Sequence, residues 1–136
     1  MTTIDAHPLL TEQLGRVRAT WPGGAWEWDG RFGCALSTVG KDLEASAREA
    51  LGAELPSIWT ADRLAEAPAV IQAVCAHAGG LRGAQRVFAA ELADGTLVYC
   101  LWWPWGSGAN FSGRIGAIAR SGENLSAVVR AALGTE

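Results

Sequence analysis

Three of the seven tryptophans lie close together in the sequence, as Trp102, Trp103 and Trp105. Large aromatic rings at the end of a strand, beside the small residues 106–108, are typical of a ligand pocket wall or an interface anchor, because tryptophan buries much area for little lost rotamer freedom. Side chains alternate between the faces of a strand, so Trp102 and Trp103 are expected on opposite sides of a sheet. The alternative is that these rings only complete a small core. Together with Trp28 they are the candidate binding aromatics.

Two charged residues interrupt otherwise apolar strand patterns. Glu91 is the lone acid on one face of a predicted hairpin, and Arg114 is the lone base of the last predicted strand, with glycines nearby at positions 113 and 116. If these strands are neighbours, the two side chains are expected to form a cross-strand ion pair or a polar spot in an aromatic pocket. The alternative is that both point to water.

A second charged and aromatic cluster lies earlier in the chain. Glu27 and Asp29 alternate with Trp26 and Trp28. Carboxylates beside aromatic ring faces are the combination that binds a cation. The alternative for this cluster is a solvated hairpin tip.

The residues most often used for metal binding or nucleophilic catalysis are sparse. His7 and His77 are the only histidines, and neither has a second ligand at zinc-site spacing. Cys34, Cys75 and Cys100 are an odd number in apolar settings, which predicts buried thiols rather than a disulfide. The last two fall within helix and strand patterns, where a nucleophile would lack a partly exposed thiolate.

The glycine-containing run 106–110 is a weak phosphate-loop candidate. Phosphate loops need a helix directly after the glycines, so that its N-terminal N–H groups meet the phosphate. Here the following residues favour a strand. The sequence therefore predicts no catalytic constellation, no metal and no cofactor.

Composition limits the class of protein. At 136 residues and 14.3 kDa, with 49% hydrophobic and 18% charged residues, the chain is predicted to be a single globular domain, 1–136. No apolar run approaches the ~20 residues that a bilayer crossing requires, and the first ten residues do not resemble a signal peptide, which favours a cytoplasmic protein without a membrane partner. The net charge of −3, with dispersed basic residues, argues against nucleic acid as a partner.

The candidate residues are organised by a hairpin over residues 88–105. Asp94-Gly95 predicts a two-residue type I′ turn, which would pair Leu92 with Leu97 and Phe88 with Leu101. One uncharged face would then collect Phe88, Ala90, Leu92, Leu97, Tyr99, Leu101 and Trp103. The opposite face is mostly apolar as well, so a helix, another subunit or a ligand is expected to cover it.

A second hairpin is predicted around Asp29-Gly30. A three-residue loop of residues 28–30 with a glycine bulge would pair Trp26 with Phe32 and leave Trp28 at the turn, partly exposed.

Helices are predicted over 9–20, over 41–51, in two pieces around Pro68 up to Ala78, and after Ser121, where apolar residues recur at helical spacing. Residues 55–59 are interpreted as a connector and 111–119 as a strand. The order is α-β-β-α-α-β-β-β-α. It favours an α+β domain: an antiparallel sheet of about five strands in two or three hairpins, with helices mainly on one face.

The many tryptophans and the lack of a catalytic constellation favour a non-catalytic protein-binding module, such as an inhibitor, an immunity-type protein or an accessory protein. Its exposed aromatic surface would bind another protein or a second copy of itself. The alternative is a small-molecule-binding domain or small enzyme with a Trp-lined pocket between sheet and helices. That pocket would be lined by Trp102 or Trp103, with Glu91 or Arg114 orienting the ligand.

Overall fold

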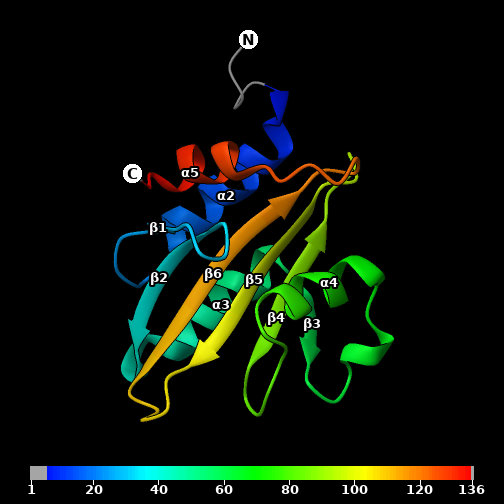
Figure 1. Cartoon of the computed structure of the whole chain (residues 1–136). Helices are drawn as coiled ribbons and strands as arrows, with labels where there is room; N and C mark the ends of the chain where they lie inside the picture. The colour runs from blue at the N-terminus through cyan, green and yellow to red at the C-terminus, as the bar shows by residue number, and fades with distance from the viewer. Residues whose placement is uncertain (1–5, 136) are drawn as a thin grey trace.

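One antiparallel sheet of six strands organises the computed structural model, which describes residues 6–135 (Figure 1). Residues 1–5, on which the signal-peptide prediction partly rests, lie outside the described residues. Across the sheet the strands are β1 (Glu27–Asp29), β2 (Cys34–Gly40), β6 (Asn110–Ile118), β5 (Leu97–Pro104), β4 (Arg86–Glu91) and β3 (Ser57–Thr60). β6 and β5, from the second half of the chain, therefore lie at the centre of the sheet.

Helices cover the two faces unequally. Three of them, α2 (Pro8–Thr20), α3 (Glu44–Glu54) and α5 (Ser126–Leu133), pack on one face and share its hydrophobic core. The fourth, α4 (Ala69–His77), lies on the other face with a smaller core of its own (Figure 1). The predicted α+β class with helices mainly on one face is confirmed. No helix within residues 6–135 is long and apolar enough to span a bilayer.

The helices of the larger layer form where their apolar spacing predicts. Pro8 opens α2, where its missing N–H costs nothing, and Leu10, Leu14 and Val17 are buried along one side. In α5 the buried residues Val128, Val129 and Leu133 form the same kind of stripe, packed against α2.

The lone helix α4 begins and ends at sequence signals. Pro68 stands at its N-cap, and two glycines with positive φ, Gly79 and Gly80, follow its last turn. Ile71 and Cys75 are its buried residues and face the sheet. A single short helix of nine residues leaves parts of this face without helical cover.

The predicted turn of the β4–β5 hairpin is wrong by one residue. Among residues 6–135 only glycines have positive φ, so Asp94 does not adopt the type I′ conformation. Instead Leu92 and Thr96 close a three-residue loop in which Gly95, at φ 87°, is the left-handed bulge residue. This register pairs Phe88 with Cys100 rather than with Leu101.

The one-residue shift exchanges the partners on each face. Tyr99, Leu101 and Trp103 do share a face, as predicted, but with Val87 and Ala89 on the α4 side of the sheet. The residues on the three-helix side are Phe88, Ala90, Val98, Cys100 and Trp102.

The first hairpin also has another register. Its loop spans residues 30–33, and Trp28 pairs with Ala35 inside β1 rather than standing at the turn. Asp29 Oδ1 accepts a hydrogen bond from the backbone N–H of Arg31 at 3.0 Å. This side-chain turn stabilises a longer loop than the bulge that was predicted.

Three smaller predictions are corrected. The supposed connector 55–59 contains the edge strand β3, whose Ile58 is exposed. The piece before Pro68 is a single 3₁₀ turn, η2 (Leu64–Glu66), and another, η1 (Lys41–Leu43), precedes α3. Finally, α5 starts at Ser126 rather than after Ser121.

Candidate functional site

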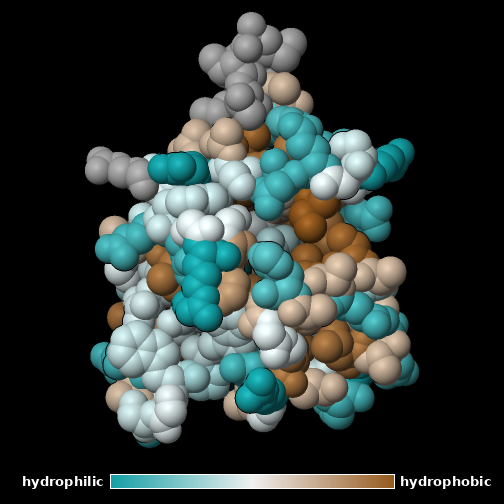
Figure 2. All heavy atoms as spheres, viewed as in Figure 1, coloured by the Kyte–Doolittle hydropathy of each residue, from teal (hydrophilic) through white to brown (hydrophobic). Residues whose placement is uncertain are grey.

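A pocket of about 220 Å³ lies between α4 and the sheet. We call it the α4 pocket. Its wall is formed by Phe32 from the β1–β2 loop, Tyr99 and Leu101 from β5, Ile118 from β6 and Val70 and Val74 from α4. Hydrophobic side chains gather on this side of the molecule, over α4 and the adjoining strand ends (Figure 2). The pocket exists because one short helix cannot fill the space over a six-stranded sheet.

The position of Tyr99 depends on a glycine in the neighbouring strand. Tyr99 pairs directly with Gly116 of β6, and its ring lies over the place where a side chain would stand. A methyl group on Gly116 would come within 2.5 Å of Tyr99 Cζ. The missing side chain therefore lets the ring lie flat against the sheet instead of filling the pocket.

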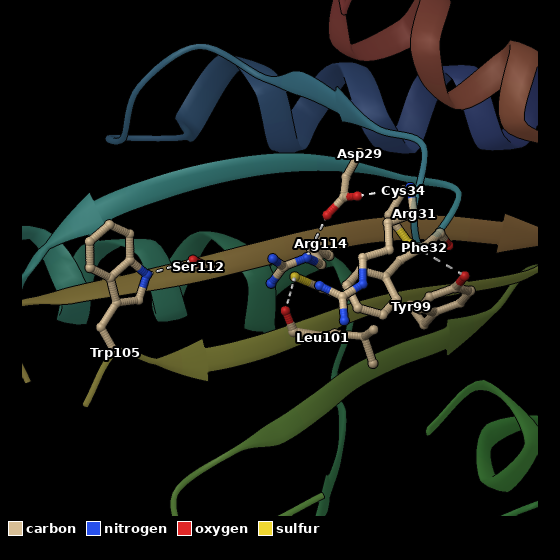
Figure 3. A network of polar contacts seen from close by, with 10 residues as sticks. Asp29, Arg31, Phe32, Cys34, Tyr99, Leu101, Trp105, Ser112 and Arg114 are labelled. Carbon is tan, nitrogen blue, oxygen red and sulfur yellow. Dashed lines mark hydrogen bonds and ion pairs between the residues drawn. The ribbon is translucent and has the colours of Figure 1, made fainter. Parts of the chain in front are cut away.

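Cys34 and Tyr99 form the polar floor of the α4 pocket. Their Sγ and Oη atoms are 3.7 Å apart, and the thiol also donates to the carbonyl oxygen of Phe32 at 3.4 Å (Figure 3). Burial raises the pKa of Cys34 to about 11 and raises that of Tyr99 well above its usual range. Both groups therefore keep their protons at neutral pH.

An ion pair beside the pocket joins two distant parts of the chain. Arg114 Nε donates to Asp29 Oδ2 at 3.0 Å, and both side chains are largely buried, with 18% and 14% exposed (Figure 3). Since the other oxygen of Asp29 accepts the N–H of Arg31, one carboxylate fixes both Arg114 and the β1–β2 loop. This loop carries Phe32 into the pocket wall.

Arg114 also stacks between aromatic rings. Its guanidinium carbon lies 4.8 Å from the ring centroid of Trp103 and 5.2 Å from that of Phe32. The two rings meet edge to face, with their centroids 5.9 Å apart. Trp103 and Arg114 are therefore brought together, as the sequence suggested for an aromatic pocket with a polar group.

The other predicted site residues are not part of this cluster. Trp102 is a core residue on the three-helix face, with 1% of its surface exposed. Trp105 is 48% exposed in the β5–β6 loop, where its indole N–H donates to Ser112 Oγ at 2.7 Å (Figure 3). Glu91 is exposed and pairs with Leu97, whereas Arg114 pairs with Leu101, so the expected ion pair between Glu91 and Arg114 is wrong.

The predicted cation cluster at β1 binds cations that belong to the protein itself. Asp29 holds Arg114, and the guanidinium of Arg130 lies 5.0 Å from the centroid of the Trp28 ring. Trp26 is buried.

The sequence prediction missed Phe32, Cys34 and Tyr99 as pocket residues. Nothing local marked them, because they come together only through the pairing of β2 with β6 and of β6 with β5. His77 also lines the pocket, from the last turn of α4. Within the described part of the chain no three His, Cys, Asp or Glu side chains are grouped in a way that would hold a metal ion.

Comparison with known proteins gives no relative from which a function could be transferred: no protein-family model matches the chain, and neither the curated proteins nor the solved structures contain a significant match.

Proposed function

We propose that this protein is a non-catalytic binding domain whose small-molecule ligand occupies the α4 pocket. The observation that supports it is a mostly apolar cavity between one helix and the sheet, with Trp103 and Arg114 placed beside it. Small-molecule sites are typically apolar clefts with a few placed polar groups. This corresponds to the predicted pocket between sheet and helices, with Trp103 and Arg114 in place of Trp102 and Glu91.

The chemistry of the pocket supports binding rather than nucleophilic catalysis. A cysteine nucleophile acts as the thiolate, and burial raises the pKa of Cys34 to about 11. The phenol of Tyr99 is likewise held in its neutral form. These groups can donate or accept a hydrogen bond, which orients a ligand without reacting with it.

The proposal is tested with the neutral fluorescent probe N-phenylnaphthylamine. Wild-type protein should give a saturable rise in probe fluorescence, and Ala73→Leu should weaken binding about tenfold by adding bulk to the pocket lining. Ala73 and Ala76 are both exposed on α4, but only Ala73 lines the pocket, so Ala76→Leu is the matched control. Absence of saturable binding, or equal affinities for the two folded variants, would refute the proposal.

A second candidate function is protein binding through Trp105. Among the large hydrophobic residues of the described chain that are exposed, Trp105 has the largest exposed fraction, and its hydrogen bond to Ser112 holds the ring in place. A rigid, exposed tryptophan is a typical interface anchor.

Affinity capture from the native lysate tests this second function. A single stoichiometric partner, or a second copy of the chain, should be retained by wild type and lost with Trp105→Ala. Retention of the same proteins by a folded Trp105→Ala variant would exclude Trp105 as the anchor. Ile58→Ala, an exposed apolar residue on β3, is the control.

A further inference from the structure

A second pocket, of about 350 Å³, adjoins the α4 pocket and is lined by three arginines. We call it the cationic pocket. Arg31, Arg82 and Arg114 line it together with Trp103, and it shares Phe32 and Ala78 with the α4 pocket. Neither pocket has an aspartate or glutamate in its lining. This is notable in a chain whose net charge is −3.

The positive charge of the cationic pocket is only partly neutralised within the protein. Arg114 has Asp29 as its partner, but none of the ion pairs among residues 6–135 involves Arg31 or Arg82. Arg31 also lies close to Arg114, since both guanidinium groups stack on Phe32, at 4.9 Å and 5.2 Å from its centroid (Figure 3). Two like charges at one ring repel each other, and an anion placed beside them would relieve that repulsion.

A donor in the same pocket lacks an acceptor. The indole N–H of Trp103 is shielded from solvent and has no hydrogen-bond partner within the described residues. Buried N–H groups are normally paired, and a missing partner is often a ligand or a water. An oxyanion is the kind of group that could accept from this N–H and from the arginines.

We propose that the ligand of this protein is an amphiphilic organic anion, with its apolar body in the α4 pocket and its carboxylate or phosphate group in the cationic pocket. The proposal rests on the function proposed above, because it assigns the chemical class of the ligand to the same site. Arg31 and Arg82 supply the unpaired charges that recognise the anionic group. Phe32, common to both pockets, lies where the apolar body meets that group.

The test compares ligands that share an apolar chain and differ in charge. Octanoate, octyl phosphate and octanol are each used to displace N-phenylnaphthylamine from the protein. At least one of the two anions should bind about tenfold more tightly than octanol, the equivalent of one charge-assisted contact, and this advantage should shrink as the ionic strength rises. Preference for octanoate over octyl phosphate, or the reverse, identifies the anionic group.

Substitution of the two unpaired arginines gives the second arm. The double variant Arg31→Gln/Arg82→Gln should lose the preference for the anions and keep the affinity for octanol and for the probe. Arg16→Gln/Arg18→Gln changes the net charge equally on α2, away from both pockets, and should behave as wild type.

The outcomes separate the two proposals. If the probe binds but octanol and both anions compete equally well, the ligand class is refuted and the binding function stands. The same holds if the anion preference survives in the Arg31→Gln/Arg82→Gln variant. If the probe itself does not bind, the binding function proposed above is refuted.

Discussion

Replacing Trp102 with alanine should remove about 3–5 kcal/mol from the free energy of unfolding, a large part of the roughly 5–15 kcal/mol typical of a domain. The Trp102 ring stacks on Phe111 at 5.7 Å between centroids and meets Trp21 and Phe88 edge to face. Removing it would leave a cavity at the centre of the three-helix face, bordered by aromatic rings that cannot easily collapse into it.

Urea denaturation, followed by far-ultraviolet circular dichroism, measures this loss. Trp102→Phe should cost less, because it keeps a stacked ring. Trp105→Ala removes the same type of side chain from an exposed site and should cost about 1 kcal/mol or less. A smaller loss for Trp102→Ala than for Trp105→Ala would show that the tryptophan cluster is not the centre of the core.

Gly116→Ala should destabilise the protein by about 1–3 kcal/mol, although it adds only one methyl group. That methyl would lie 2.5 Å from Cζ of the buried Tyr99 ring and 3.0 Å from Cε1, so the ring would be pushed toward the α4 pocket. The backbone itself would accept alanine, because the φ angle of Gly116 is not positive. The variant should therefore lose affinity for the probe as well as stability.

Gly113 offers a matched control in the same strand. A methyl group there would lie 3.5 Å from the nearest carbons of Trp102, an ordinary contact, so Gly113→Ala should change stability by less than about 1 kcal/mol. In a Tyr99→Ala background, Gly116→Ala should cost little, because the clashing ring is gone. An equal cost of Gly116→Ala with and without the Tyr99 ring, in a thermal or urea denaturation experiment, would contradict this explanation.

Sequence patterns were most successful where a single element determines the outcome. The apolar spacing of Leu10, Leu14 and Val17 predicted α2, and simple alternation placed Trp102 and Trp103 on opposite faces of β5. These patterns depend only on the geometry of one helix or one strand. They were sufficient for the α+β class.

Pairing between elements was harder to predict. Asp94-Gly95 suits both a two-residue turn and a three-residue loop with a glycine bulge, and the choice between them shifts the register by one residue. The strand β3 has only four residues and gave no alternating signal that could separate it from a connector.

The candidate site was the least predictable part. Asp29 and Arg114 are 85 positions apart, and no local pattern indicates that β2 pairs with β6 and so brings them together. The sequence did single out Arg114 and Trp103, because a charge and a large ring stood out from their surroundings. It could not identify Arg31 and Arg82 as their neighbours.

The strand order has a consequence for how the chain folds during synthesis. β2 obtains its inner neighbour only when β6 has been made, since Val39 pairs with Phe111, and α2 packs against α5 at the very end of the chain. Until then the apolar residues of α2 and β2 lack most of their final cover. Contacts of such long sequence separation slow folding and leave hydrophobic segments exposed on the ribosome. Closure of the main core is therefore a late, post-translational step.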